Sequence, residues 1–227
     1  MIEFLLLDLD DTILDFHKSE RIGITKTLEQ FGLRATEEVL TTYSAINKRH
    51  WEMLERGELT REEVLTGRFK VLFEGFGMEV DATACARAYE VHLSGEAHFL
   101  PGAKETVERL AKKYRLFLVS NGTASVQDGR LTGAGLYPYF EIVFISQEIG
   151  YNKPAKEYFD RCFAQIPGFD PQKAIIVGDS LTSDILGGIN AGIATCWVNP
   201  KGLPCGDIVP DHQIKSITEL EQLLEQL

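Results

Sequence analysis

The stretch "FLLLDLDDTILD", residues 4–15, joins four apolar residues to a group of acids. Phe4–Leu7 is an uninterrupted apolar run, which is typical of a strand that helices cover on both faces of a parallel sheet. Asp8, Asp10 and Asp11 follow within four positions, and like charges this close repel one another. Folding does not require such an arrangement, so we expect a function at the end of this strand.

Four further apolar runs of the same kind occur later in the chain: Leu116–Val119, Ile142–Ile145, Ala174–Val177 and Thr195–Val198. Helical patterns follow them or lie between them: Lys104–Lys113, Val126–Gly133, Lys156–Ala164, Asp184–Ala191 and Thr218–Leu227. Strands that alternate with helices are typical of βαβ units. The sequence therefore predicts an α/β fold with a doubly wound parallel sheet.

The connection after the first strand is far longer than the others and reads as a helical insertion. Residues 16–98 give four helical patterns, broken near Gly32, Gly57 and Gly75–Gly77. Thr60 and Glu63 have the spacing of a capping box at the start of one helix. We expect a core domain of residues 1–15 and 99–227, with residues 16–98 as a helical cap over the carboxyl ends of the strands.

Composition narrows the class of partner. The 227 residues carry a formal net charge of −11, which disfavours a nucleic-acid polymer or an anionic membrane as the main partner. The apolar run at the N-terminus is too short for a signal peptide or a membrane span, so we expect a cytoplasmic protein. The four cysteines are scattered, without a CxxC pair, which disfavours a disulfide scaffold or structural zinc. No obligate protein partner is evident.

Polar residues also follow the other predicted strands. Ser120 and Asn121 come directly after the second strand, and Lys153 follows the third after a short loop. Asp179 comes just after the fourth strand, with Asp184 five residues beyond. In an open parallel sheet, ligands bind beyond the carboxyl ends of the strands. We therefore expect these side chains to meet Asp8 and Asp10 at one edge.

Carboxylates, one hydroxyl and one lysine suit phosphoryl transfer. An ionised carboxylate can attack phosphorus and form an acyl phosphate, which divides one difficult step into two easier ones. A second carboxyl can protonate the leaving oxygen and later deprotonate water. Carboxylates are also ligands that Mg²⁺ prefers.

The charge of this group supports a metal. Asp8, Asp10, Asp179 and Asp184, with Lys153, give a net charge of −3 if all are ionised. A phosphate dianion would be repelled from such a site. One Mg²⁺ reduces the charge to −1, and protonation of Asp10 reduces it to zero, so we expect a divalent cation to be required.

Four motifs in this order resemble those of the haloacid dehalogenase (HAD) superfamily of phosphohydrolases: "DLDDT" at 8–12, "VSNG" at 119–122, "KP" at 153–154 and "GDSLTSD" at 178–184. The resemblance covers the whole chain. It implies that Asp8 is the nucleophile and Asp10 the general acid/base. It also implies that Asp8, the Asp10 carbonyl and Asp179 hold Mg²⁺.

The same resemblance implies roles for the remaining polar residues. Ser120, with Asn121 beside it, and Lys153 would bind the phosphoryl oxygens. Asp184 would orient either Lys153 or a metal-bound water.

The stretch "INKRHWEMLERGELTREEVLTGRF", residues 46–69, is similar to the YjjG/YfnB-type branch of this superfamily. That likeness implies a phosphatase for small phosphate esters, with nucleoside 5′-monophosphates as substrates and pyrimidines preferred. Trp51 and Arg68 are candidate cap contacts for a base, although aromatic residues on helices are more often part of a core.

Other functions remain open at this stage. Asp8 and Asp10, taken alone, also fit a turn at the end of a strand. A sugar-phosphate phosphatase or a phosphomutase would use the same fold and motifs. A phosphorylation-dependent signalling domain shares the acids, the hydroxyl and the lysine, but such domains lack a long helical insertion.

Overall fold

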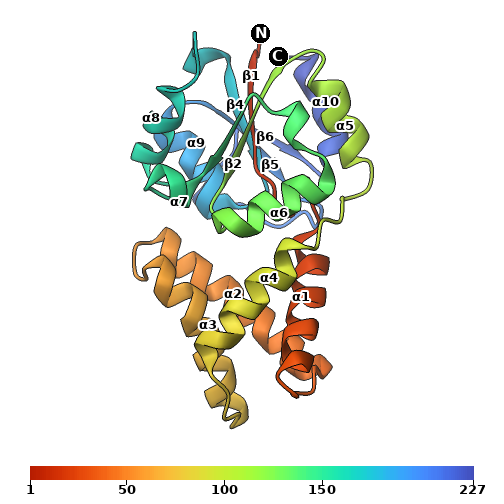
Figure 1. Cartoon of the computed structure of the whole chain (residues 1–227). Coiled ribbons are helices and arrows are strands. Elements are labelled where there is room, and N and C mark those ends of the chain that lie inside the picture. Colours follow the sequence, from red (N-terminus) through yellow and green to blue (C-terminus); the bar gives the residue numbers. More distant parts are fainter.

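A computed structural model describes all residues, 1–227, and contains one parallel sheet and two groups of helices (Figure 1). The strands are β1 (Phe4–Leu7), β2 (Arg115–Ser120), β3 (Ile142–Ile145), β4 (Ala174–Gly178), β5 (Ala194–Val198) and β6 (His212–Ile214). All neighbouring strands pair in parallel, in the order β3-β2-β1-β4-β5-β6. The predicted doubly wound α/β fold is confirmed.

Helices cover both faces of this sheet. They are α5 (Ala103–Leu110), α6 (Ala124–Ala134), α7 (Ser146–Ile149), α8 (Lys156–Phe163), α9 (Leu186–Ala191) and α10 (Leu220–Leu224). Short helical turns are η1 (Tyr137–Tyr139), η2 (Pro171–Lys173), η3 (Leu181–Ile185) and η4 (Ile217–Glu219). In Figure 1, α5, α6 and α10 lie on one side of the sheet, and α7, α8 and α9 lie on the other.

Alternation along β1 explains why this strand is apolar throughout. Leu5 and Leu7 belong to the core cluster that contains α5 and α10, while Phe4 and Leu6 belong to the cluster that contains α8. Successive side chains of a strand point to opposite faces, so a strand between two helical layers needs apolar residues at every position.

The insertion after β1 forms four helices: α1 (Phe16–Gln30), α2 (Glu37–Glu55), α3 (Arg61–Phe76) and α4 (Ala82–Ser94). They form a hydrophobic cluster that includes Tyr43, Phe69 and Tyr89, and Val126 of α6 also belongs to it. The capping box of Thr60 and Glu63 is present at the start of α3, as predicted. Figure 1 shows α1–α4 beyond one edge of the sheet, at the end away from the two termini.

Some elements differ from the prediction. The last helix, predicted over Thr218–Leu227, begins as the short turn η4 and continues as α10. Strand β6 was not predicted, because "HQI" is too short and too polar to show an apolar run. The helix predicted over Asp184–Ala191 is divided into η3, a π-type turn, and α9. None of the helices combines the length and the apolar character needed to span a membrane.

Candidate active site

The strand order places β1 and β4 side by side at the centre of the sheet. From this pair the chain winds outward in both directions, through β2 and β3 on one side and β5 and β6 on the other. Such a reversal opens a crevice at the carboxyl ends of the strands, where ligands bind in folds of this kind. Asp8 follows β1 directly and Asp179 follows β4 directly, so both lie at this position.

Lys153 lies between two carboxylates. Its Nζ is 2.7 Å from Asp8 Oδ1 and 2.6 Å from Asp184 Oδ1, and it also donates to the Val119 carbonyl at 2.9 Å. All three donor positions of the ammonium are thus used, and only 1% of the residue is exposed. The lysine therefore has one fixed position, with its charge beside Asp8.

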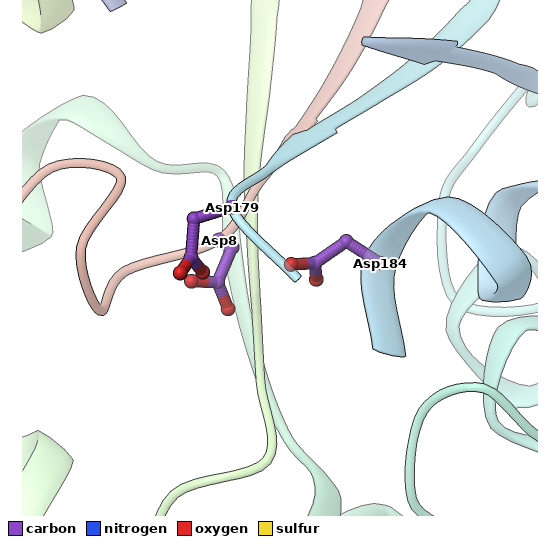
Figure 2. Close-up of side chains that lie close together, drawn as sticks. All are labelled: Asp8, Asp179 and Asp184. Atoms are coloured by element: carbon purple, nitrogen blue, oxygen red, sulfur yellow. The ribbon is translucent and has the colours of Figure 1, made fainter. Parts of the chain in front are cut away.

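Three carboxylates meet at the end of β1 and β4 (Figure 2). Asp8, Asp179 and Asp184 each offer an oxygen, and these oxygens lie within 4.8 Å of one another. Gly178 makes this approach possible, because a Cβ there would lie 2.2 Å from the Asp184 carboxyl group. The second oxygen of Asp184 accepts a hydrogen bond from the Ser180 backbone at 3.1 Å. Asp184 is thus engaged with Lys153 and its own loop, which supports the first of the two roles predicted for it.

Burial makes the negative charges of this group costly. Burial raises the pKa of the Asp8 carboxyl to about 8; nearby Lys153 opposes the rise, and Asp184 and Asp10 add to it. Burial also raises the pKa of Asp179 well above its ordinary value, and the charge of Asp8 adds to this effect. Burial alone would lower the pKa of Lys153, but the Asp184 and Asp8 carboxylates raise it. One lysine does not balance the buried carboxylates.

A divalent cation fits this donor set. Hard cations such as Mg²⁺ bind carboxylate oxygens, and Asp8, Asp179 and Asp184 present such oxygens close together. The buried Asp8 and the half-buried Asp179, both with raised pKa values, are carboxylates that a divalent ion would stabilise in the ionised form. The Asp179 loop is also held in place, because the Trp197 indole donates to the Asp179 carbonyl at 2.7 Å.

The side chains of the neighbouring residues Ser120 and Asn121 make different contacts. Ser120 is buried at the end of β2, where its Oγ accepts from the Gly122 backbone at 3.1 Å and from Gln127 at 2.9 Å. The Asn121 side chain instead joins two loops: it donates to the Lys153 carbonyl at 2.9 Å and accepts from the Lys153 backbone at 2.8 Å. The Asn121 side-chain amide thus holds the lysine loop, and the predicted phosphate contact of Asn121 stays a prediction.

Asp10 lies beside the site but outside the three-carboxylate group, with 28% of its side chain exposed. Its partners are Gln127 and Arg130 on α6, which the sequence analysis did not single out. Their signal was a glutamine and an arginine three positions apart, hence on one face, in the helix that follows Ser120. Both side chains can donate hydrogen bonds to a carboxylate, and the arginine can also neutralise its charge.

The helical insertion contacts the loops of the site through the end of α2 and the start of α3. The Arg61 guanidinium donates to the Asn121 carbonyl at 2.9 Å and to Asn152 Oδ1 at 2.8 Å. It also lies 5.5 Å from the centre of the partly buried Trp51 ring. Glu55 accepts from Thr182 at 2.7 Å, and burial raises the pKa of Glu55 to about 7. Arg61 and Glu55 were not predicted, because nothing in the sequence shows which cap residues face the core.

Arg68 has a different location from the one predicted. Only 2% of this residue is exposed, and its guanidinium donates to Asn47 Oδ1 at 2.7 Å within the cap. It also lies 4.9 Å from the centre of the Tyr89 ring in the cap's own hydrophobic cluster. Arg68 is therefore part of the cap interior and not a cap contact for a base.

The fold agrees with comparisons to known proteins. The family model described as haloacid dehalogenase-like hydrolase matches residues 5–198. The chain is 36% identical to the pyrimidine 5′-nucleotidase PynA of Streptococcus pneumoniae, over 99% of this chain and 95% of that protein. It is 33% identical to the pyrimidine 5′-nucleotidase YjjG of Escherichia coli, over 98% of this chain and 97% of that protein.

A solved structure gives the same result. The magnesium-bound crystal structure of the HAD-hydrolase YfnB from Bacillus subtilis superposes with a TM-score of 0.94, at 36% identity and over 99% of both chains. The family match covers more than half of the chain, and these relatives match it almost from end to end. This chain belongs to the haloacid dehalogenase-like hydrolase family.

Proposed function

We propose that this hydrolase is a Mg²⁺-dependent phosphomonoesterase that acts through an aspartyl-phosphate intermediate. The observation that carries the proposal is the position of Asp8, whose carboxylate lies 2.7 Å from Lys153 Nζ and within 4.8 Å of an Asp179 oxygen. A buried nucleophile beside a fixed cation and a second acidic ligand is suited to a substrate with several negative charges.

Mg²⁺ would be held by the carboxylates of Asp8 and Asp179 and by the backbone carbonyl of Asp10. When bound, the ion would neutralise these carboxylates and withdraw charge from the phosphoryl oxygens. The donor set described above supports this assignment, as does the magnesium in the YfnB crystal structure.

The residues of the chain would carry out two displacements. Asp8 attacks phosphorus while the bond from phosphorus to the ester oxygen breaks, and the Asp10 carboxyl gives its proton to that oxygen. Asp10 then takes a proton from water, whose oxygen attacks the aspartyl phosphate and releases inorganic phosphate and free Asp8. Ser120 Oγ would donate to one phosphoryl oxygen, and Lys153 Nζ would exchange its contact with Asp8 Oδ1 for a phosphoryl oxygen as Asp8 attacks phosphorus.

The proposed substrates are nucleoside 5′-monophosphates, with pyrimidines preferred. The full-length similarity to PynA and YjjG supports this choice. Helices α1–α4, residues 16–98, would act as the cap that selects the substrate. Within it, Trp51 is the candidate base contact, because its ring lies beside Arg61, which reaches the loops of the site.

Steady-state kinetics on UMP, dUMP, dTMP, purine monophosphates and sugar phosphates tests this proposal. We expect phosphate release that depends on Mg²⁺ and stops with EDTA, with the highest kcat/KM for a pyrimidine nucleotide. A higher kcat/KM for a sugar phosphate would overturn the substrate class. Recovery of an isomeric phosphate ester in place of inorganic phosphate would identify a phosphomutase.

A further inference from the structure

The Asp10 carboxylate has one partner for each of its oxygens, and both partners lie on α6. Arg130 Nη1 pairs with Asp10 Oδ1, and Gln127 Nε2 donates to Asp10 Oδ2 at 2.7 Å. Donors on both oxygens fix the plane of a carboxylate as well as its position. Asp10 is therefore held in one orientation even though part of its side chain is exposed.

The two partners are themselves held. Arg130 Nη1 also donates to Gln127 Oε1 at 3.0 Å, and Arg130 Nε donates to the Glu96 carbonyl at 3.1 Å. Gln127 Nε2 donates to Ser120 Oγ at 2.9 Å as well as to Asp10. These contacts define the orientation of the Gln127 amide, because only its NH₂ group can serve two acceptors. One glutamine thus joins Asp10 to Ser120.

The backbone leaves room for this arrangement at two glycines. A Cβ at Gly122 would lie 2.3 Å from Gln127 Nε2, so a larger residue would displace the amide. A Cβ at Gly129 would lie 2.7 Å from the Ser94 carbonyl at the end of α4, so α6 passes very close to this helix. This approach brings Arg130 to Glu96, which lies on the segment that returns from the cap to the core.

Stability alone does not account for an arginine at position 130. The side chain is 0% exposed, and its Nη2 has no hydrogen-bond partner. A buried ion pair generally gives no more stability than well-packed apolar residues would, and an unpaired buried donor adds a cost. The guanidinium lies 5.7 Å from the centre of the Phe16 ring, against which an apolar side chain would pack without that cost.

We propose that Gln127 and Arg130 are positioning residues that hold Asp10 for proton transfer to the leaving oxygen. This inference, which we call the α6 clamp, rests on the proposed function. Arg130 contacts neither Asp8 nor Lys153, so it acts through Asp10. Through Gln127, the clamp also joins the proton donor Asp10 to Ser120, the hydroxyl proposed to bind the phosphoryl group.

The clamp makes a specific kinetic prediction. An ester with a strongly basic leaving group, such as phenyl phosphate or UMP, needs a proton from Asp10 as its bond breaks. The leaving group of p-nitrophenyl phosphate departs without that help. Arg130→Met and Gln127→Met should lower kcat for phenyl phosphate and UMP about 10²-fold. They should lower kcat for p-nitrophenyl phosphate only about tenfold. KM should change little, because neither residue holds phosphate directly.

Two comparisons separate positioning from general damage. Arg109→Met on α5 removes an arginine outside the site and should leave the ratio of the two aryl-phosphate rates unchanged. Asp10→Asn combined with Arg130→Met should be no slower on phenyl phosphate than Asp10→Asn alone, since the clamp has no function without its carboxylate. Thermal unfolding shows whether Arg130→Met is folded. If it is not, Gln127→Met gives the same comparison of the two aryl-phosphate rates.

Equal losses on both aryl phosphates, or additive losses in the double variant, would overturn the clamp while the phosphatase itself stands. A wild-type protein that releases no phosphate from any of the three esters would instead overturn the proposed function, and the clamp with it.

Discussion

Lys153 Nζ lies 2.7 Å from Asp8 Oδ1, although 145 positions separate the two residues in the chain. The contact depends on the order of strands in the sheet. Asp8 directly follows β1, and Lys153 lies beyond β3, which is two strands away from β1. The backbone of this loop is fixed by Asn121, and the lysine side chain is fixed by Asp184. The position of the charge beside the nucleophile is thus set by three separate segments.

Asp8→Asn should abolish turnover while the fold is kept. Asparagine has nearly the same shape, but its amide cannot form an acyl phosphate, so kcat should fall by about 10⁴-fold or more, as when other enzymes lose a nucleophile. Phosphate release under saturating substrate measures this. Asp160→Asn on the exposed face of α8 is the matched control and should retain wild-type activity. Substantial activity in Asp8→Asn would rule out the aspartyl-phosphate route.

Lys153→Met should destabilise the metal-free protein by about 3–5 kcal/mol, because it leaves the buried Asp8 and Asp184 carboxylates without their cation. Urea unfolding in EDTA gives the free energy of unfolding directly. Lys156→Met removes an exposed lysine that pairs with Asp160, and it should have little effect. Similar losses of unfolding free energy in the two variants would show that the buried ion pairs of Lys153 contribute no more stability than the exposed pair of Lys156.

The stability of the metal-free protein should fall as the pH rises. Burial raises the pKa of Asp8 from its ordinary 3.8 to about 8, so between these values the folded protein holds a proton that the unfolded chain releases. The free energy of unfolding therefore decreases with pH in this window. Mg²⁺ binds the ionised carboxylates and should raise the Tm more at about pH 8 than at about pH 6.

Thermal unfolding with EDTA and with Mg²⁺ across this range measures both effects. Asp8→Asn lacks the titrating group, so its Tm should depend less on pH. A metal-free Tm that does not change with pH, together with an equal effect of Mg²⁺ at both ends, would contradict the electrostatic account of the site.

The sequence allowed the sheet and its polar edge to be predicted, because both have local signals. Buried strands such as Phe4–Leu7 are continuous apolar runs, and Asp8 and Asp179 follow their strands directly. Parallel pairing then brings these ends together whatever the details of the loops. The first and last residues of β3 were predicted correctly for the same reason.

The cap contacts had no such signal, and the α6 clamp had only the three-residue spacing of Gln127 and Arg130, which does not show what they contact. Arg68 and Arg61 lie on the same helix, α3, and only the packing shows that the first faces the interior and the second faces the core loops. Asn121 follows a strand as Ser120 does, but its side chain turns to a neighbouring loop. Contacts between distant segments of this kind depend on three-dimensional packing, which local patterns do not encode.

Arg61 should control the closed position of the cap. Its Nη1 donates to the carbonyls of Asn121 and Gly122, and its Nη2 donates to Ser146 Oγ at 2.6 Å and to Asn152 Oδ1 at 2.8 Å. A planar guanidinium can reach these acceptors together, whereas a lysine ammonium cannot. Arg61→Lys and Arg61→Ala should therefore favour an open cap and lower kcat/KM by about ten- to hundredfold.

Small-angle X-ray scattering should give a larger radius of gyration for Arg61→Ala than for the wild type, because the cap would move away from the loops after β2 and β3. The Tm should change little, since Arg61 belongs to neither of the two largest hydrophobic clusters. Arg87→Ala, on the exposed side of α4, is the control for loss of a cap arginine. If Arg61→Lys matches the wild type in both scattering and kcat/KM, the four contacts do not hold the cap, and closure must depend on Glu55 and Thr182 or on substrate alone.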